Sequence, residues 1–378
     1  MPLPHITRED VDYALSYIDL HGVPPDRKST KFCLIYEGRH YPPKYVYALA
    51  ADHRTGKTLH PEEFSGGKQT NIPLARLGFQ IQKCHRCHPA ISARRKPPAI
   101  ARLVLDGVLP DQPARATEML LQAFTHWPDG FTADFLVTPG GFVTHELSSE
   151  IPAAKGWNSK EEDFPVLQDQ AEKCLREILT PRVLAAAKGR AKYLTIGIDL
   201  TTADKTFGAE LVAVVDLLSG RILGWTGKSY PTKDQEATLW QVKDVTSHCL
   251  EVDGFRVLVL GCHDLNMFSN RAWTNMVQGS LRHKSTAKMR AVARRFHPDV
   301  ILQHPHDTDT PRIWATAWAG ARELFHPIAW ASGIYYRGTK DSRDTLESVL
   351  RGTRSSDGPF CEIILRPGRS PRVCFEQD

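Results

Sequence analysis

Imidazole and carboxylate side chains follow three strand-like runs in the C-terminal half of the sequence. The runs are residues 193–198, 256–260 and 300–302, and each is mainly apolar. In open α/β sheets, ligands bind outside the carboxyl ends of the strands, so side chains that follow neighbouring strands meet at one site. The side chains in question are Asp199, His263, Asp264, His304, His306, Asp307 and Asp309.

This set of side chains predicts a site for divalent metal ions. Imidazole and carboxylate are ligands that suit Mg, Mn or Zn. Two such ions about 3.5–4 Å apart stabilise the attacking and leaving oxygens of a phosphodiester displacement. A helix expected to begin at Pro311 adds backbone N–H groups that favour a phosphate. The predicted metal ligands are Asp199, Asp264, His304, His306, Asp307 and Asp309, and the predicted catalytic residues are Asp199, His263, Asp264, His304 and His306.

The sequence therefore predicts a metal-dependent nuclease or phosphodiesterase, and other interpretations stay open. A His-Asp pair at a strand end is often a hydrogen-bonded anchor of its loop. The domain would then be a degenerate, non-catalytic module that binds DNA or a nucleotide. Hydrolysis of a substrate other than nucleic acid is a further alternative. Cys262 adjoins His263, but neighbours on a strand point to opposite faces, so adjacency does not make them a catalytic pair.

The segments that would position these groups predict an α/β domain over residues 190–378. Strand-like runs at 210–218 and 221–230 are joined by Ser219-Gly220, a hairpin signal that favours a mixed sheet over a wholly parallel one. The expected fold class is α/β, with a mixed β-sheet flanked by helices. Further strands are expected at 328–336 and 360–365, and helices at 232–246, 286–296, from Pro311 onward and at 345–350.

The order of these elements is similar to the ribonuclease H-like arrangement. That resemblance concerns element order only. It implies acidic metal ligands on the first and fourth strands of the domain. The ligands would then be Asp199, Glu210 or Asp216, and Asp264, with His304 and His306 peripheral.

Residues 84–189 are expected to connect this domain to an N-terminal one. The basic, proline-broken segment 94–98 has the composition of a hinge. Helical spacing occurs at 116–124 and 167–178. Between them, runs at 131–137 and 142–143 flank Pro139-Gly140-Gly141, which predicts a strand pair with a glycine turn.

The segment also contains a cluster of potential metal ligands, Cys84, His85, Cys87 and His88. It matches the C-x-x-C-H pattern of haem attachment, but covalent haem attachment needs export and the sequence begins without a signal peptide. Zinc is the more sensible ligand, although no second cysteine pair follows at zinc-ribbon spacing. A plain connector with incidental thiols is the alternative, and most of the eight cysteines are expected to be free.

Residues 1–83 predict a small α+β head domain. Thr7 and Asp10 form a candidate helix cap, residues 32–36 are strand-like, and a second helix is expected from Pro43 to Gly56. Basic side chains in this region suit phosphate contacts with a nucleic acid. The candidates are Lys44, Lys57, Lys68 and Arg76.

Three blocks of the head carry a family resemblance: residues 41–50, which begin Tyr-Pro-Pro-Lys-Tyr, residues 62–71, which contain Phe-Ser-Gly-Gly, and Leu77-Gly78-Phe79. They resemble the N-terminal head domain of the ScoMcrA group of modified-DNA-dependent restriction endonucleases. The resemblance implies association with DNA in prokaryotic restriction or defence. In that group the nuclease is a separate C-terminal HNH domain, and no HNH pattern occurs here.

Composition sets few further bounds. The 378 residues, 41% of them hydrophobic, suffice for two or three packed domains. A formal net charge of +5 is compatible with nucleic acid but does not identify the partner. No apolar run approaches the roughly 20 residues of a membrane helix, so we expect a cytoplasmic protein without membrane contact. The sequence does not identify a protein partner, so protein partners stay unknown.

Overall fold

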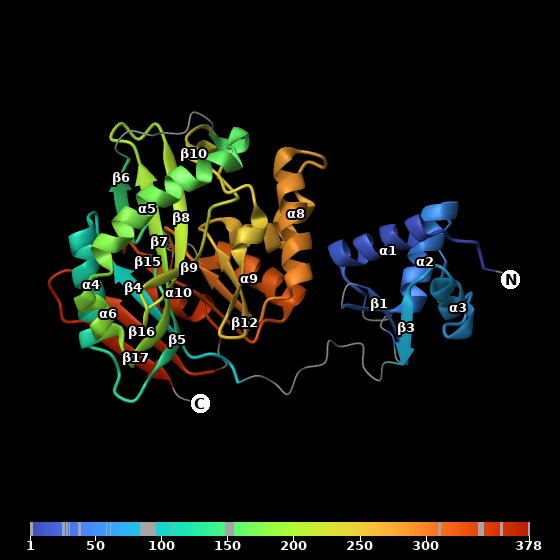
Figure 1. Cartoon of the computed structure of the whole chain (residues 1–378), viewed down its shortest axis with the longest axis horizontal. Coiled ribbons are helices and arrows are strands. Elements are labelled where there is room, and N and C mark those ends of the chain that lie inside the picture. Colours follow the sequence, from blue (N-terminus) through green and yellow to red (C-terminus); the bar gives the residue numbers. More distant parts are fainter. Residues whose placement is uncertain are drawn as a thin grey trace. The chain divides into compact units, whose positions relative to one another are not determined.

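The structure is a computed structural model of the chain. It describes residues 3–24, 27, 29, 31–36, 39–57, 59–60, 62–83, 96–107, 109–147, 155–308, 311–338, 344–355 and 358–376. The chain divides into two compact units, unit 1 (Met1–Lys96) and unit 2 (Pro97–Asp378), which Figure 1 colours along the sequence. Among the described residues, no helix is both long and apolar enough to cross a membrane.

Unit 1 packs helices against a small antiparallel sheet in which β1 lies between β2 and β3. The predicted cap of the first helix is confirmed, because the Asp10 carboxylate accepts a hydrogen bond from the Thr7 backbone N–H at 2.8 Å and the Thr7 hydroxyl accepts one from Asp10. Gly56, with φ of 67°, ends the second helix as expected. The elements are α1 (Arg8–His21), β1 (Phe32–Tyr36), β2 (Arg39–Tyr41), α2 (Pro43–Thr55), α3 (Lys68–Arg76) and β3 (Gln80–Lys83).

The described cysteines include one that is disulfide-bonded and five that are free. Cys33, in β1, is disulfide-bonded. The prediction that most cysteines are free is confirmed for Cys174, Cys249, Cys262, Cys361 and Cys374.

Unit 2 contains a ten-stranded mixed sheet, here the large sheet. Its main path runs β10-β8-β7-β5-β4-β16-β17, while β15 pairs with β4, β6 with β7 and β9 with β8. The predicted hairpin at Ser219-Gly220 is confirmed, because β8 and β9 are antiparallel neighbours. The strands are β4 (Ile100–Asp106), β5 (Ala133–Val137), β6 (Val143–Glu146), β7 (Ala191–Thr201), β8 (Gly208–Asp216), β9 (Arg221–Gly227), β10 (Leu239–Trp240), β15 (Ile334–Tyr336), β16 (Phe360–Leu365) and β17 (Arg372–Glu376).

A second, four-stranded sheet of unit 2, here the small sheet, has the order β11-β12-β13-β14. Strands β12, β13 and β14 are parallel, and β11 is antiparallel to β12. The strands are β11 (Cys249–Val252), β12 (Phe255–Leu260), β13 (Val300–Gln303) and β14 (Ala329–Ser332).

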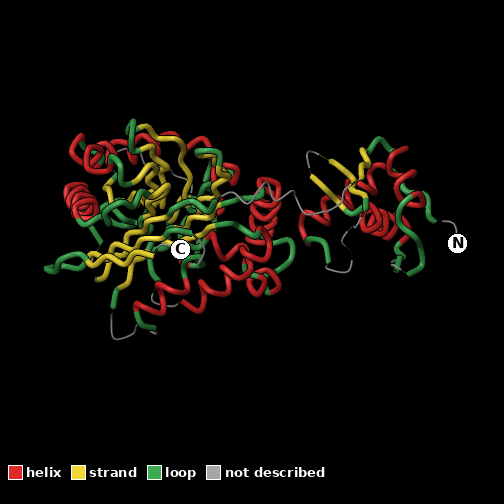
Figure 2. Tube along the Cα trace, turned by 90° about the horizontal axis from the view of Figure 1, so that it is seen from below, coloured by secondary structure: helices red, strands yellow, loops and turns green. Residues whose placement is uncertain are grey.

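The two sheets of unit 2 pack face to face, and helices cover their outer faces (Figure 1). One apolar cluster joins Phe135 and Val212 of the large sheet to Val257 and Leu302 of the small sheet. The opposite face of the large sheet packs against α4 (Pro113–Thr125), α5 (Phe164–Ile178) and α6 (Pro181–Ala187). The opposite face of the small sheet packs against α8 (Leu281–Phe296) and α9 (Pro311–Phe325). Figure 2 shows the strands between these helices.

Alternation along the strands explains this layering, because successive side chains point to opposite faces. In β4, Ala101, Leu103 and Leu105 pack with α4 to α6, whereas Ile100 faces the small sheet. At the end of the large sheet, α10 (Leu346–Gly352) covers the face that carries Val104. The coarse prediction of an α/β domain with a mixed sheet is therefore confirmed.

Several local predictions differ from the structure. Strands β5 and β6 do not pair with each other around Gly140-Gly141; each lies parallel to β7, so the predicted strand pair is wrong. Residues 84–189, expected to be a connector, contribute β4 to β6 and α4 to α6 to unit 2. These pairings join strands that are distant in the sequence, and local sequence patterns do not predict such pairings.

Two further segments also differ. In place of the helix predicted at 232–246 the structure has the short 3-10 helices η4 (Asp234–Ala237) and η5 (Val245–His248) around β10. The strand predicted at 328–336 is divided between β14 in the small sheet and β15 in the large sheet. Strand β7, which carries Asp199, and β12, which precedes Asp264, also belong to different sheets, unlike the single sheet that the ribonuclease H-like order implied.

Candidate active site

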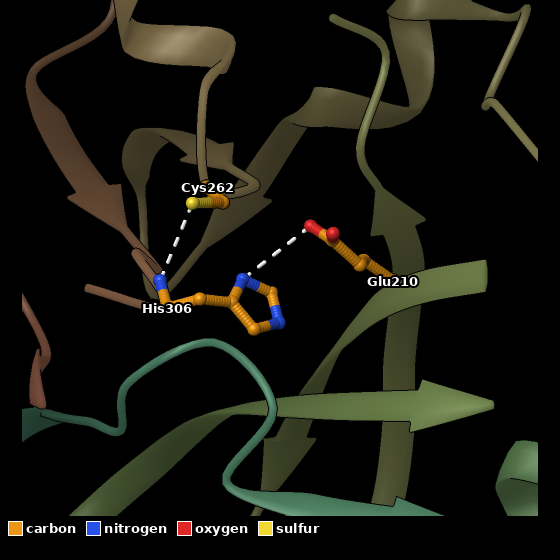
Figure 3. A group of neighbouring side chains, drawn as sticks. All are labelled: Glu210, Cys262 and His306. Atoms are coloured by element: carbon orange, nitrogen blue, oxygen red, sulfur yellow. Dashed lines mark hydrogen bonds and ion pairs between the residues drawn. The ribbon is translucent and has the colours of Figure 1, made fainter. Parts of the chain in front are cut away.

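The candidate site lies where strand ends of the two sheets of unit 2 meet. Asp199 of β7 and Glu210 of β8 are direct partners across an antiparallel pair, so their side chains share one face of the large sheet. Cys262 follows β12 and His306 follows β13 in the small sheet. Because β12 and β13 are parallel neighbours, their carboxyl ends leave the sheet at the same edge. Figure 3 shows Glu210, Cys262 and His306 turned toward one another.

The His306 ring lies between two carboxylates. Its Nε2 is 2.9 Å from both Asp199 oxygens, and its Nδ1 is 3.4 Å from Glu210 Oε2. Burial lowers the pKa of His306, but the charges of Asp199 and Glu210 raise it well above the ordinary value. The ring is therefore an imidazolium at neutral pH.

The Cys262 thiol is buried and surrounded by groups that favour its thiolate. Its Sγ accepts a hydrogen bond from the His306 backbone N–H at 3.3 Å. Burial raises the pKa of Cys262, but the positive charge of Lys228 and hydrogen bonds from His263 and His306 lower it to about 6. At neutral pH the thiol is therefore ionised, and a thiolate is the nucleophilic form of cysteine.

Lys228 and Glu210 form a buried ion pair beside this thiol. The Lys228 Nζ lies 3.0 Å from Glu210 Oε1, and only 1% of the lysine side chain is exposed. Gln235 Nε2 donates to the same carboxylate oxygen at 2.9 Å. Burial raises the pKa of Glu210, but His306 and Lys228 lower it below its usual range, so the carboxylate is ionised. Burial likewise opposes the charge of Lys228, and the surrounding anions raise its pKa.

Two glycines after β5 leave room for the histidine and its carboxylate. A Cβ added at Gly140 would lie 2.8 Å from His306 Nδ1, and one added at Gly141 would lie 2.5 Å from Asp199 Oδ2. Gly141 also has φ of 56°, which side chains rarely adopt. The segment predicted as a hairpin turn is thus the wall of the site against which the imidazole packs.

Asp264 anchors the loops of the site through hydrogen bonds to backbone N–H groups. Its Oδ1 accepts from the backbone N–H groups of Ser229 and Tyr230 at 2.9 and 2.8 Å, and its Oδ2 accepts from Gly261 at 3.0 Å. These bonds tie the segment after β9, which carries Lys228, to the segment after β12. Asp264 therefore occupies the role of a hydrogen-bonded loop anchor, the alternative considered for the His-Asp pairs.

Of the remaining residues predicted for the site, His263 lies at the Cys262 thiol, whereas the others have separate surroundings. His263 lies beside Cys262 and its ring centroid is 5.6 Å from that of Trp314. His304 is fully buried, and burial lowers its pKa to about 3, so its ring is neutral. Asp307 forms a partly exposed ion pair with Arg337 at 3.5 Å. Asp309 lies outside the described residues.

The structure adds functional candidates that the sequence interpretation had missed or set aside. Lys228 was not proposed. Cys262 was set aside because adjacent residues of a strand point to opposite faces, and that argument is wrong here, since a hydrogen bond from His263 is among the causes that lower the pKa of Cys262. The hairpin register was the available signal: Leu211 pairs with Gly227, which puts Glu210 opposite Lys228 at the open end of β8 and β9. Opposite charges at such positions indicate a cross-strand ion pair.

The basic candidates of unit 1 lie on its second and third helices or beside them. The Lys44 Nζ lies 5.0 Å from the centre of the Phe64 ring, and Lys68 is the first residue of α3. Lys57, Lys68 and Arg76 are exposed, whereas Lys44 is half-buried. The zinc candidates Cys84, His85, Cys87 and His88 lie outside the described residues.

One comparison with known families matches unit 1. Residues 5–83 match the family described as the ScoMcrA-like, N-terminal head domain, which confirms the resemblance found in the sequence. The match covers most of unit 1 and none of unit 2. No curated protein matches the chain.

Among solved structures, matches include amidases from Nesterenkonia. One, an amidase from Nesterenkonia sp., has 15% identity and a TM-score of 0.39, with 64% of this chain and 80% of that chain covered. Another, a mutant of the Nesterenkonia AN1 amidase from the nitrilase superfamily, has 15% identity and a TM-score of 0.39, with 64% and 78% covered. At these TM-scores the similarity does not establish a shared fold or activity.

Proposed function

We propose that unit 2 is a cysteine-dependent hydrolase or transferase that acts on a carbonyl carbon, as in an amide or ester. The observation that supports this proposal is the convergence of Lys228, Glu210 and His306, from three separate strands or loops, on the Cys262 thiol. A cysteine nucleophile needs a lowered pKa and a neighbouring acid or base, and these residues supply both.

In the proposed reaction, the Cys262 thiolate attacks the carbonyl carbon and forms an S–C bond. The bond to the leaving amine or alcohol then breaks, and the leaving group takes a proton from the His306 imidazolium. A water molecule next attacks the thioester and gives its proton to the neutral His306, which restores the imidazolium and the thiolate. Lys228 remains charged throughout, and it stabilises the thiolate that attacks and later leaves.

Acylation of the full-length protein by p-nitrophenyl acetate tests this proposal. We expect one acetyl group on Cys262 by mass spectrometry and release of p-nitrophenolate, both lost in Cys262→Ala. Cys374→Ala is the matched control, because Cys374 is a free, half-buried thiol away from the site. Acetylation that persists in Cys262→Ala contradicts the assignment. A wild-type protein that is never acetylated favours a non-catalytic binding module.

Metal-dependent phosphodiester hydrolysis, the function predicted from the sequence, is a second candidate. One observation favours it: ligand atoms of Glu210, Cys262 and His306 all lie within 4.8 Å of one another. Asp199 binds the other nitrogen of the His306 ring, as carboxylates do beside metal-bound imidazoles. The set differs from the predicted ligands, since Asp264 and Asp307 have other partners.

Calorimetry with Zn²⁺ or Mn²⁺ tests the second candidate, together with cleavage of bis-p-nitrophenyl phosphate. Metal binding that is lost in Glu210→Gln, with cleavage that a chelator abolishes, supports it. If neither metal binds, the metal-dependent candidate is excluded, and the proposed thiol reaction is unaffected.

We also propose that unit 1 associates the chain with DNA in prokaryotic restriction or defence. The support is the ScoMcrA-like match over residues 5–83 and the exposed basic residues of that unit. Titration of the full-length protein with modified and unmodified duplex DNA at several salt concentrations tests it. We expect salt-sensitive binding that Lys68→Glu/Arg76→Glu weakens. Binding that is unchanged by this double substitution removes unit 1 from the DNA contact.

A further inference from the structure

Helix α8 and the segment before it form a stretch of unit 2 with cationic but no acidic residues. From residue 265 to residue 298 the sequence contains no Asp or Glu. Its Lys and Arg residues are Arg271, Arg282, Lys284, Lys288, Arg290, Arg294 and Arg295. The formal charge of this stretch exceeds the +5 of the entire chain, so the rest of the protein is close to neutral overall.

Two of these arginines form contacts within unit 2. Arg290 is buried; its guanidinium donates to the Met267 carbonyl at 3.0 Å and lies over the Trp273 ring. Arg282 pairs with Glu236 at 2.5 Å. These two arginines hold α8 against the neighbouring loops and are not available to a partner.

Three other cations lie on the exposed side of the helix. Lys284, Lys288 and Arg295, here the basic α8 face, are exposed and spaced four and seven residues apart, which places them on one side of an α-helix. With a rise of about 1.5 Å per residue, the row extends roughly 16 Å along the axis. Lys288 donates to the Lys243 carbonyl at 3.2 Å, and no described carboxylate forms an ion pair with Lys284 or Arg295.

One acidic group, Asp244, interacts with Lys288 of this row. Burial raises the pKa of Asp244, but hydrogen bonds from Thr246 and the charge of Lys288 lower it. Its carboxylate accepts hydrogen bonds from the backbone N–H and hydroxyl of Thr246, and no ion pair joins it to Lys284 or Arg295 among the described residues. A compact anion would contact one or two of the three cations. An extended row of separated cations instead matches an extended polyanion, in which phosphates repeat along a strand.

We propose that the basic α8 face contacts the phosphate backbone of duplex DNA and is a second DNA-binding surface besides unit 1. This inference rests on the proposed association of the chain with DNA. Contact between α8 faces of two copies of the chain is disfavoured, because a two-fold interface would bring like charges together. The contact is independent of base sequence, since it involves phosphates only.

The test is the salt dependence of duplex binding by the full-length protein carrying Lys284→Glu/Lys288→Glu. We expect the slope of log K against log salt to fall in magnitude by about two, since each lost phosphate contact removes about 0.9. Binding should weaken equally for unrelated duplex sequences. The matched control is Arg182→Glu/Lys188→Glu, which makes the same charge change at exposed residues of unit 2 in or beside α6.

The outcomes distinguish this inference from the proposed function. If the α8 variant behaves like the α6 control while Lys68→Glu/Arg76→Glu loses binding, the α8 surface is excluded and DNA association by unit 1 stands. If α8 and α6 variants weaken binding equally, net charge and not this surface is responsible, which also overturns the inference. If the wild-type protein does not bind duplex DNA in low salt, both proposals fail. Binding of an acidic protein, in place of DNA, to the basic α8 face would also overturn the inference.

Discussion

At the scale of single residues, the site depends on charge pairs that neutralise one another inside unit 2. Cys262 and Glu210 are anionic, and Lys228 and His306 are cationic. Removing one partner leaves an uncompensated charge, so each substitution changes the pKa of its neighbours in a direction that can be stated.

Lys228→Met should reduce the reactivity of Cys262 at neutral pH. In the wild-type protein the thiolate fraction rises as pH rises through about 6, the pKa of Cys262. Without the positive charge of Lys228 that pKa rises, and the alkylation profile shifts to higher pH. The measurement is the rate of iodoacetamide labelling of Cys262 against pH, with Cys374 as the internal reference. An unchanged profile means that Lys228 does not activate the thiol.

His306→Gln should remove a stabilisation that is present at low pH and lost at high pH. The folded pKa of His306 lies well above the ordinary value of about 6.5. Its contribution to stability is therefore complete below about pH 6.5 and disappears as pH rises through the folded pKa. Urea unfolding of both proteins from pH 6 upward measures the difference, which should shrink with rising pH. A difference that grows with pH contradicts the charged state of this ring.

Tryptophan fluorescence reports these unfolding transitions for unit 2 alone. All eight tryptophans lie between residues 127 and 330, and unit 1 has none. Unfolding of unit 1 therefore does not enter the measured signal, and changes at a residue of unit 2 can be assigned to that unit.

At the scale of elements, a buried arginine joins strands and helix at one end of the large sheet. Arg102 of β4 is fully buried and forms an ion pair with Glu362 of β16. Its guanidinium also donates to the Leu350 carbonyl of α10 at 2.7 Å and to the Thr353 hydroxyl at 2.8 Å. The pair fixes β4 beside β16 and holds α10 over both strands.

Glu362→Ala should destabilise unit 2 by about 3–5 kcal/mol, because it leaves the Arg102 guanidinium buried without a counter-charge. Urea unfolding followed by tryptophan fluorescence measures the loss. The control is Glu172→Ala, which breaks the surface pair with Arg176 and should leave the midpoint almost unchanged. Equal effects of the two substitutions would show that the buried pair has no special role.

At the scale of the whole molecule, the candidate site is built from unit 2 alone. Among the described residues, the hydrogen-bond and ion-pair partners of Cys262, His306 and Glu210 belong to Pro97–Asp378. The basic α8 face belongs to the same unit, and the ScoMcrA-like match belongs to the other.

A protein of residues 97–378 should therefore keep the alkylation profile of Cys262 that the full chain shows. Its midpoint should stay near pH 6, since the charges that lower the thiol pKa are all retained. The comparison needs only iodoacetamide labelling and mass spectrometry on both proteins. A midpoint that moves toward the ordinary thiol pKa would indicate that unit 1 supplies part of the environment.

The sequence by itself determined the local features of this chain. The Thr7–Asp10 cap, the Ser219-Gly220 hairpin and the strands before Cys262 and His304 all follow from short-range patterns of polarity, capping and turn chemistry. The family of the N-terminal head domain could also be recognised from the sequence, because its motifs are contiguous. The convergence of polar groups at strand ends followed from the same patterns, and it brought Asp199 and His306 into consideration.

Only the tertiary structure decided which of those groups lie together. The Asp264 carboxylate accepts hydrogen bonds from backbone N–H groups. Cys262, set aside from the sequence, lies among His263 and three groups that are distant in the chain: Glu210 in β8, Lys228 after β9 and His306 after β13. A pKa depends on burial and on charges within a few ångströms in space, so no local pattern could report it. The division of the strands into two sheets could not be predicted from local patterns either. Strand pairing joins residues without regard to their separation in sequence.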